Sequence, residues 1–363
     1  MFINSLELSN YRNYNNLSIT FNPGITILYG DNAQGKTNIL EAIYVSGTTK
    51  SHRGSSDKEI IKFEEDESHI RLNLTKNDVG HRIDMHLRKN KSKGVAVDGQ
   101  SIKKTGELFG IIHIIFFSPE DLSIIKNAPS ERRKFLNLEL CQLNKLYYHN
   151  YTNYNKALNH RNTLLKQICF RPSLIDTLDM WDASLIEYGK GIIEERENFI
   201  RQLNDIVKSI HSHLTGGKES IEIGYEKNVE IKDYENAIKA KREIDLKYQS
   251  TQVGPHRDDI CFYINGIDVR KFGSQGQQRT AALSLKLAEI ELVKSIIHDN
   301  PILLLDDVMS ELDSNRKNYL LDSIKEIQTI VTCTGYDDFI KSRLHINQIY
   351  KVTNGTIEIF DQY

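Results

Sequence analysis

Hydrophobic and polar residues alternate at several places in the N-terminal third of the chain, and the alternation predicts a strand-rich region. Residues 2–8 alternate as a half-buried strand does. Residues 69–74 and 82–87 share this period of two and are predicted to pair as a hairpin. Residues 111–117 are apolar almost throughout, which is typical of a strand buried on both faces. We therefore expect a sheet here, with one helix over residues 38–44.

A helical period replaces this alternation in the middle of the chain. From about residue 130 to residue 247 the pattern is largely helical and highly charged, and Gly216-Gly217 is expected to break the helices. Four tyrosines near the start of this region share one helix surface. We favour packing in an antiparallel helix pair over a base-stacking platform for nucleic acid. These residues are Tyr147, Tyr148, Tyr151 and Tyr154.

Strand patterns return in the last third of the chain. Residues 260–264 and 267–269 are predicted to form a hairpin across Asn265-Gly266, and a long helix is predicted over residues 279–297. Strands that alternate with helices in this way predict an α/β fold. The remaining predicted strands are residues 302–305, 329–332, 349–352 and 356–360, with the last two joined at Asn354-Gly355.

One loop, between a predicted strand and a predicted helix, matches the phosphate-binding pattern G-x-x-x-x-G-K-[ST]. Gly30 and Gly35 carry no Cβ, so the backbone can turn tightly and approach a phosphate. Successive N–H groups and the following helix N-terminus can then hold an anion. Lys36 can reach the β- and γ-phosphates, and the Thr37 hydroxyl can bind Mg²⁺. The predicted nucleotide-binding residues are Gly30, Asp31, Asn32, Ala33, Gln34, Gly35, Lys36 and Thr37.

A second acidic group follows a later apolar strand. Residues 301–305 are apolar and lead into Asp306 and Asp307. This is the Walker B pattern, in which Asp306 lies beside the phosphate loop and holds Mg²⁺. Asp307 is then placed to orient or deprotonate an attacking water. The alternative is a buried strand that ends in a solvated acidic turn.

A third motif, residues 273–279, opens the predicted long helix. It reads Gly-Ser-Gln-Gly-Gln-Gln-Arg, and its small residues and hydroxyl at a helix N-terminus predict another anion site. Ser274, Gly276 and Gln277 are the candidate ligands. A plain N-cap with a glycine turn is the alternative, because the motif is weak when it is taken alone.

Composition narrows the possible partners. The chain has 363 residues, 47 of them Lys or Arg and 49 Asp or Glu, and its net charge of −2 excludes a strongly cationic nucleic-acid-binding protein. A local basic stretch remains at residues 82–104, where a solvated hairpin face and a phosphate-contacting face explain the charges about equally well. The four cysteines form no C-x-x-C pair and predict free thiols in a reducing cytoplasm.

No membrane segment is expected. Mean hydropathy is −0.45, and the chain has no apolar run near the roughly 18 residues of a membrane helix. The N-terminus lacks the basic and apolar regions of a signal peptide. We therefore expect a cytoplasmic protein without a membrane partner.

The motifs together resemble the ABC-type ATPase heads of SMC-like DNA repair proteins, and the resemblance covers the whole chain. It implies a P-loop ATPase head with a mixed sheet, called lobe I, at residues 1–118 and 298–363. It also implies a second, mainly helical lobe at residues 119–297 with a short antiparallel arm at about 130–247. The segments that carry the resemblance are residues 10–14, 30–37, 50–53, 118–122, 254–259, 273–279 and 303–313.

This resemblance implies ATP and Mg²⁺ as cofactors and an ATP-driven homodimer. Ser274 and Gly276 of one subunit, with Gln277 beside them, would meet the γ-phosphate held by the phosphate loop of the other subunit. Arg12 resembles the arginine that lies near the phosphates in such heads. The implied catalytic residues are Asp307 and Lys36, and the implied Mg²⁺ ligands are Thr37 and Asp306.

Three positions depart from the usual pattern of these heads. Asp307 stands where Glu is usual, and the shorter side chain sets the base back. Because a displacement of about 1 Å can cost roughly 10²-fold in rate, we expect a weak, DNA-stimulated ATPase in which ATP acts as a switch. Residues 332–334 read Thr-Cys-Thr where transporters place His, and residues 118–121 read Ser-Pro-Glu-Asp without the glutamine of the Q-loop.

Two further motifs have open roles. His52-Arg53 fits a loop near the nucleotide base or the DNA path, and a surface turn explains it nearly as well. Residues 256–259 read His-Arg-Asp-Asp, without the ligand spacing of a zinc site. We favour a turn of lobe II with an internal ion pair over a direct contact with nucleotide or DNA.

The resemblance implies an ATP-dependent DNA-binding protein of recombinational repair and replication restart. Such a protein would bind DNA gaps or single/double-strand junctions, promote recombinase loading with the mediator proteins RecR and RecO, and act in SOS induction. The alternative from another class is the ATPase subunit of an ABC-type transporter, against which the long helical region and the missing His argue. A structural SMC-type linker is a third possibility, although the predicted arm is short for a long coiled coil.

Overall fold

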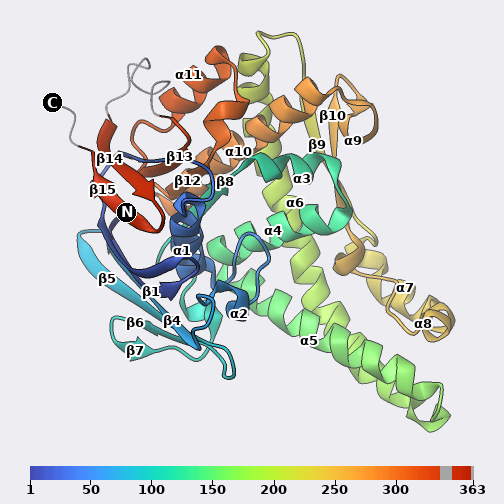
Figure 1. Ribbon diagram of the computed structural model, residues 1–363. Helices are drawn as coiled ribbons and strands as arrows, with labels where there is room; N and C mark the ends of the chain where they lie inside the picture. The colour runs from blue at the N-terminus through green and yellow to red at the C-terminus, as the bar shows by residue number, and fades with distance from the viewer. Residues whose placement is uncertain (336–345, 361–363) are drawn as a thin grey trace. The chain divides into compact units, whose positions relative to one another are not determined.

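Two six-stranded sheets form the framework of one of the two units into which the chain divides (Figure 1). The computed structural model describes residues 1–335 and 346–360. One unit comprises Met1–Asp121 and Glu289–Tyr363, and the other comprises Leu122–Ala288. The predicted lobe bounds stay a prediction. The C-terminal part predicted for lobe I includes residues 336–345 and 361–363, which lie outside the described residues.

The antiparallel sheet has the strand order β2-β1-β4-β5-β6-β7. Along β4, Ile70, Leu72 and Leu74 are buried on one face, while the intervening residues point to the other. Strands β4 and β5 meet at Asn77 and Asp78, whose positive φ angles of 49° and 61° suit a tight hairpin turn. The strands predicted at residues 2–8, 69–74 and 82–87 are confirmed, and β2 and the short β7 were missed. The bounds are β1 Phe2–Tyr11, β2 Tyr14–Thr20, β4 Glu67–Lys76, β5 Val79–Arg88, β6 Gly94–Val97 and β7 Gln100–Ser101.

The central sheet has the order β15-β14-β3-β13-β12-β8, in which all neighbours pair in parallel except β14 and β15. Because parallel strands end at the same edge, the segments that follow β3, β8, β12 and β13 gather there. The predicted strands and the closing hairpin are confirmed. The bounds are β3 Ile25–Tyr29, β8 Ile114–Phe117, β12 Ile302–Asp306, β13 Thr329–Cys333, β14 Ile346–Thr353 and β15 Thr356–Ile359.

The strand predicted at residues 111–117 is shorter than expected, since β8 begins only at Ile114. Gly110 has a φ of 91°, and the Ile111 N–H donates to the Leu108 carbonyl, so a turn occupies the first part of the apolar run. Ile112 is fully buried and Ile111 is half-buried, so packing and not strand pairing explains the apolar character of these two residues.

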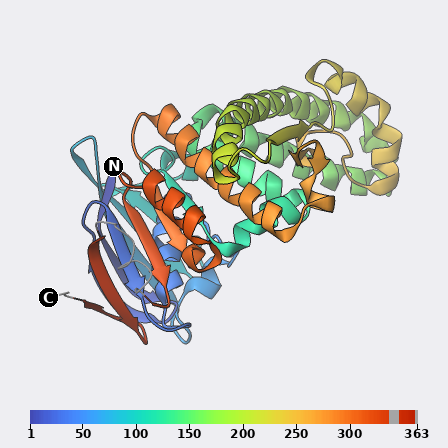
Figure 2. The same ribbon diagram turned by 90° about the horizontal axis from the view of Figure 1, so that it is seen from above.

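Helix α1 forms the centre of this unit. It contacts β4 and β5 of the antiparallel sheet and β8, β12 and β13 of the central sheet. Ile39, Leu40 and Ile43 are fully buried, as expected for a helix that is apolar on most sides. Figure 2 shows the blue strands of the antiparallel sheet and the orange and red strands of the central sheet in the same unit. The other helices that lie wholly or partly here are α2 Asp57–Ile60, α10 Gln275–Ile297 and α11 Ser314–Ser323, and α1 spans Lys36–Thr48.

The other unit is mainly helical and contains a small sheet of order β11-β10-β9. The predicted hairpin at Asn265-Gly266 is confirmed. Strand β9 corrects the largely helical prediction for residues 130–247, because Gly216 and Gly217 end α6 and the following residues pair with β10. The helices are α3 Leu122–Lys126, α4 Pro129–Leu143, α5 Lys145–Ile168, α6 Leu178–Leu214, α7 Tyr234–Ala240, α8 Arg242–Tyr248 and α9 Val269–Phe272, and the strands are β9 Ile221–Glu226, β10 Asp259–Ile264 and β11 Ile267–Asp268.

Helices α5 and α6 form the predicted antiparallel pair. The end of α5 meets the start of α6, where Arg161 binds Asp182, and the start of α5 meets the middle of α6, where Tyr147 accepts a hydrogen bond from Arg196. Tyr147 and Tyr154 are buried, and Tyr148 and Tyr151 are half-buried. The packing interpretation of these tyrosines is therefore confirmed.

Candidate functional site

The phosphate loop lies between β3 and α1, and two of its glycines are required by their surroundings. Gly30 has a φ of 154°, and a Cβ there would lie 2.3 Å from the Val352 carbonyl oxygen. Gly35 has a φ of 113°, and a Cβ there would lie 2.6 Å from Asn13 Nδ2. A side chain at either position would move the loop, so the glycines serve packing as well as phosphate approach.

Two distant segments hold Gln34, in the middle of the loop. Asn13 Nδ2 donates to the Gln34 carbonyl at 3.0 Å, and the Tyr14 hydroxyl donates to the next carbonyl at 3.1 Å. From the β14–β15 turn, the Asn354 N–H donates to Gln34 Oε1 at 2.6 Å and the Gly355 N–H donates to its carbonyl at 3.2 Å. The loop is therefore fixed in shape before a ligand arrives, which lowers the ordering cost of binding.

Lys36 lies folded over its own loop. Its Nζ donates to the carbonyls of Gly30 and Asp31 at 2.6 and 2.7 Å, and the residue is 8% exposed. Burial lowers the pKa of Lys36, while Asp307 and Asp306 oppose the shift. A phosphate in the loop would be a stronger acceptor for this ammonium group than two neutral carbonyls.

A hydrogen-bonded group of three residues lies at the edge of the sheet where β12 and β13 end. Asp306 Oδ1 accepts from Thr37 Oγ1 at 2.8 Å and from Thr332 Oγ1 at 2.7 Å. The Thr332 hydroxyl in turn accepts from the Asp307 N–H at 3.0 Å. Asp307 has a φ of 53°, and burial raises the pKa of its carboxyl group. Thr332 therefore positions both acidic residues, a role that its sequence position did not suggest.

The oxygen atoms at this edge are suitable ligands for Mg²⁺. Thr37 and Asp306 offer hard oxygen ligands 2.8 Å apart. Two neighbouring ligands in an octahedral Mg²⁺ shell, each about 2.05 Å from the ion, are about 2.9 Å apart. The pair could therefore accept Mg²⁺ with little movement.

These elements enclose a cavity of about 570 Å³, within the range of nucleotide and cofactor sites. Most predicted loop residues and both acidic residues line it, which brings the two motifs together. Residues 118–121 and 332–334 were predicted only as departures at the Q-loop and switch positions, and Asn38 was not predicted as a site residue. The lining residues are Asn32, Ala33, Gln34, Gly35, Lys36, Thr37, Asn38, His52, Arg53, Ser118, Pro119, Glu120, Asp306, Asp307 and Thr332.

The His52-Arg53 loop forms one wall of this cavity. The His52 ring stacks on Phe116 with centroids 4.0 Å apart, and it meets the edge of Tyr44 at 5.7 Å. Arg53 Nη1 donates to Asn38 Oδ1 at 3.3 Å. The loop was one of the two open motifs, and its place on the cavity wall favours the role near the nucleotide over the surface turn.

Arg12 is bound by a carboxylate of α1. Its guanidinium donates to both oxygens of Glu41 at 2.6 and 2.8 Å and to Ser55 Oγ at 2.8 Å. Burial alone raises the pKa of Glu41, but hydrogen bonds from Arg12 and Ser51 outweigh it, and the pKa lies below its ordinary value. The predicted phosphate contact of Arg12 stays a prediction.

Ser274, Gly276 and Gln277 lie in the other unit, at the N-terminus of α10. The Ser274 N–H donates to Gln277 Oε1 at 3.0 Å, and the Gln277 N–H donates to Ser274 Oγ at 3.2 Å. This reciprocal arrangement is a capping box, which agrees with the N-cap alternative. Ser274 and Gly276 are nevertheless exposed and open to a partner. Their contact with ATP stays a prediction.

Residues 256–259 form the turn that we favoured, but the ion pairs of its aspartates reach arginines of other elements and do not lie within the turn as predicted. Asp258 accepts from Arg196 at 3.0 Å and Asp259 binds Arg132 at 2.6 and 2.9 Å. His256 is half-buried, and its Nδ1 lies 2.6 Å from the Tyr154 hydroxyl. Burial lowers the pKa of His256 to about 4. The two aspartates of this turn therefore attach it to α4 and α6.

Several charges of the basic stretch, residues 82–104, are balanced within the chain. Arg82 binds Asp84 at 2.8 Å, Lys93 binds Asp57 at 3.0 Å, and Lys89 lies 3.6 Å from Asp66. These pairs favour the solvated hairpin face for part of the stretch.

Comparison with known proteins identifies the family of the chain. Residues 2–358 match the family described as "RecF/RecN/SMC N terminal domain". The chain is 62% identical to "DNA replication and repair protein RecF" of Lachnoclostridium phytofermentans, over 99% of both proteins. It is similar to the solved "Structure of the recombination mediator protein RecF-ATP in RecFOR pathway", with TM-score 0.93 and 37% identity over 99% of this chain and 98% of that one.

A more distant likeness concerns the fold alone. The Smc head domain of Pyrococcus furiosus, solved with an extended coiled coil and bound to the C-terminal domain of ScpA, superposes with TM-score 0.57 at 16% identity, over 99% of this chain and 96% of that one. Within residues 1–335 and 346–360, the helices are too short or too polar to cross a membrane.

Proposed function

The chain belongs to the RecF family of DNA replication and repair proteins, ATP-binding members of the SMC-like ATPases, and we propose that it is an ATP-switched DNA clamp of recombinational repair. The observation that carries the proposal is the group Thr37, Asp306 and Thr332 beneath the phosphate loop. It joins both nucleotide motifs in one cavity. Because the chain belongs to the RecF family, we set aside the alternative that it is the ATPase subunit of a transporter.

Each residue of the cavity has a proposed task. The N–H groups of residues 30–37 and the start of α1 bind the phosphates, and Lys36 exchanges its two carbonyl partners for phosphate oxygens. Thr37 and Asp306 hold Mg²⁺, which neutralises phosphate charge when it is bound. Asp307 orients the attacking water. Its short side chain keeps ATP hydrolysis slow, so the ATP-bound state persists. DNA binding accelerates the hydrolysis.

The nucleotide is proposed to join two subunits. Ser274, Gly276 and Gln277 are presented at the N-terminus of a 23-residue helix, where N–H groups and the helix dipole favour an anion. In the dimer they complete the γ-phosphate site of the other subunit. ATP then closes the dimer, and hydrolysis opens it.

DNA is the proposed cargo of the closed dimer. We expect binding at gaps and single/double-strand junctions through phosphate contacts, with strong salt dependence and little sequence preference. One solved relative is described within the RecFOR pathway, which supports RecR and RecO as partners in recombinase loading. A cytoplasmic location and a part in SOS induction belong to the same proposal.

The test is ATP-dependent dimerisation, measured by light scattering with and without gapped DNA. Lys36→Arg and Ser274→Arg should each prevent it, whereas Ser212→Arg, at an exposed serine of α6, should not. An equimolar mixture of the two defective variants should regain part of the dimer, because such a heterodimer contains one intact composite site. The composite-site proposal fails if neither variant changes dimerisation or if the mixture regains nothing.

A further inference from the structure

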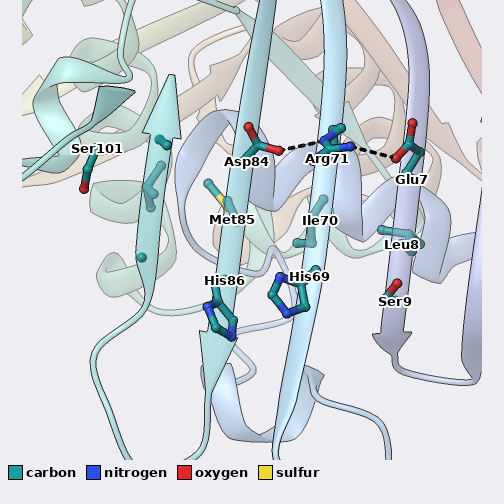
Figure 3. A pocket seen from close by; sticks show the side chains of 13 residues that line it. Glu7, Leu8, Ser9, His69, Ile70, Arg71, Asp84, Met85, His86 and Ser101 are labelled. Carbon is teal, nitrogen blue, oxygen red and sulfur yellow. Dashed lines mark hydrogen bonds and ion pairs between the residues drawn. The ribbon is translucent and has the colours of Figure 1, made fainter. Parts of the chain in front are cut away.

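Three side chains that can bind a metal meet on the exposed face of the antiparallel sheet. Glu67 and His69 lie two residues apart on β4, so they point to the same face. His86 on β5 is the direct partner of His69 in the ladder. Directly opposite residues have Cβ atoms about 5 Å apart. Figure 3 shows His69 and His86 side by side on neighbouring strands.

The ligand atoms are already close together. His86 Nε2 lies 2.8 Å from Glu67 Oε2, and His69 Nε2 lies 3.9 Å from Glu67 Oε1. The two imidazole rings stack with centroids 4.1 Å apart. One ligand atom from each residue lies within 4.8 Å of the other two. Two ligands of a tetrahedral zinc ion, each about 2.05 Å from the metal, are about 3.3 Å apart. Small side-chain rotations would therefore suffice.

We propose that Glu67, His69 and His86 bind one Zn²⁺ ion, with a fourth position open to solvent. Two imidazole nitrogens and one carboxylate form a donor set that zinc uses in proteins. Mg²⁺ prefers oxygen ligands, so the ion that accompanies ATP does not compete for this site. The site is thus chemically distinct from the nucleotide cavity.

The surroundings leave room for the ion and its fourth ligand. A surface pocket of about 400 Å³ lies over this part of the sheet, and His69 and His86 are among the residues that line it. Gly94, the partner of His86 on β6, has no side chain to cover the imidazole. Arg71, the nearest cation along β4, is paired with Asp84 at 2.7 Å and Glu7 at 3.4 Å, so two carboxylates balance its charge. Water or an anionic group can occupy the open position.

Zinc at this place would link two neighbouring strands. Glu67 and His69 come from β4 and His86 comes from β5, so the ion would tie the two strands together through side chains as well as the ladder. Any ion that binds the folded chain and not the unfolded chain raises stability. Zinc should therefore raise the melting temperature, and removing one ligand should reduce that increase.

The test uses the full chain without a histidine tag, after chelator treatment and dialysis. Titration with Co²⁺ should give one saturable visible absorption band, and Zn²⁺ should displace it. Glu67→Gln and His86→Ala should each weaken Zn²⁺ binding by about tenfold or more, because each removes one of three ligands. His81→Ala removes another histidine of β5, paired with Asp98, and should leave binding unchanged.

Two results would overturn the site. In the first, the wild type binds Zn²⁺ no more tightly than Glu67→Gln and His86→Ala do, which would mean an adventitious ion only. The other is an equal loss in His81→Ala. ATP binding should stay the same in all variants, so this test is independent of the proposed nucleotide switch.

Discussion

Thr332 is expected to control hydrolysis without touching the phosphates, and Thr332→Val tests this. Thr332 is 1% exposed at the end of β13, between the strands that carry the two nucleotide motifs. Its hydroxyl donates to Asp306 at 2.7 Å and accepts from the Asp307 N–H at 3.0 Å. Valine has nearly the same shape, so the substitution removes both hydrogen bonds and leaves no cavity.

The structure sets the size of the effect. A hydrogen bond to a charged group contributes about 1.5–3 kcal/mol, and a buried N–H without an acceptor costs about 1–3 kcal/mol. Asp306 keeps its bond from Thr37 at 2.8 Å, so we expect a loss of about 2–4 kcal/mol in unfolding free energy. Asp307 has a φ of 53° and loses one of the contacts that hold it there. A shift of about 1 Å costs roughly 10²-fold, so hydrolysis should fall between roughly tenfold and hundredfold.

The assay separates binding, chemistry and stability. Equilibrium binding of a fluorescent ATP analogue should change little, because the phosphate loop does not depend on Thr332. Single-turnover hydrolysis at saturating ATP measures the chemical step, and denaturant unfolding measures stability. Thr329→Val is the matched control, since Thr329 is buried on the same strand and its hydroxyl donates to the Ile327 carbonyl at 3.0 Å. Thr332→Ser should restore hydrolysis.

Two results would refute the reasoning. In one, Thr332→Val hydrolyses ATP at the wild-type rate. In the other, both threonine variants lose hydrolysis equally, which would mean that general loss of stability is the cause.

Three further predictions concern stability. Burial lowers the pKa of His256 from 6.5 to about 4, so the unfolded chain takes up the proton first, and stability should fall by about 3 kcal/mol from pH 6.5 to pH 4; His256→Gln should remove this dependence from denaturation curves. Arg161→Met should cost about 3–5 kcal/mol in urea unfolding, because Asp182 and Asp245 each lie 2.6 Å from Arg161 in a buried group. Thr26→Val should raise the free energy of unfolding by about 1 kcal/mol and with it the melting temperature. The reason is that the buried Thr26 hydroxyl has no hydrogen-bond partner among the described residues.

Each of these has a control or a contrary outcome. His160→Gln changes an exposed histidine and should leave the pH dependence intact. Arg171→Met changes an exposed arginine and should cost little. A melting temperature for Thr26→Val at or below the wild-type value would mean that the hydroxyl is satisfied, for example by water.

Local pattern was sufficient where consecutive residues form one element. The strand, loop and helix around the phosphate loop were predicted because the loop's function needs neighbouring backbone N–H groups. Strand β9 was missed because its six residues follow a long helical pattern. The strand at residues 111–117 was predicted too long, because buried turns and buried strands are equally apolar.

Pairing between distant residues was harder to foresee. Arg12 was predicted to lie near the phosphates, which stays a prediction, and its pairing with Glu41 of α1 was not foreseen. Thr332 looked like a missing switch residue, and its hydroxyl donates to the Asp306 carboxylate and accepts from the Asp307 N–H. Both outcomes depend on which strands are neighbours, and many strand orders are compatible with the same alternation.

The sequence by itself determined that the chain is an α/β protein with a nucleotide loop and a strand that ends in two aspartates, because such features depend on residues a few positions apart. The tertiary structure decided that β13 lies between β3 and β12, and hence that Thr332 positions both aspartates. It also brought Asn354 to Gln34 and His86 to His69. These contacts depend on the register and order of strands, which packing of the whole core selects.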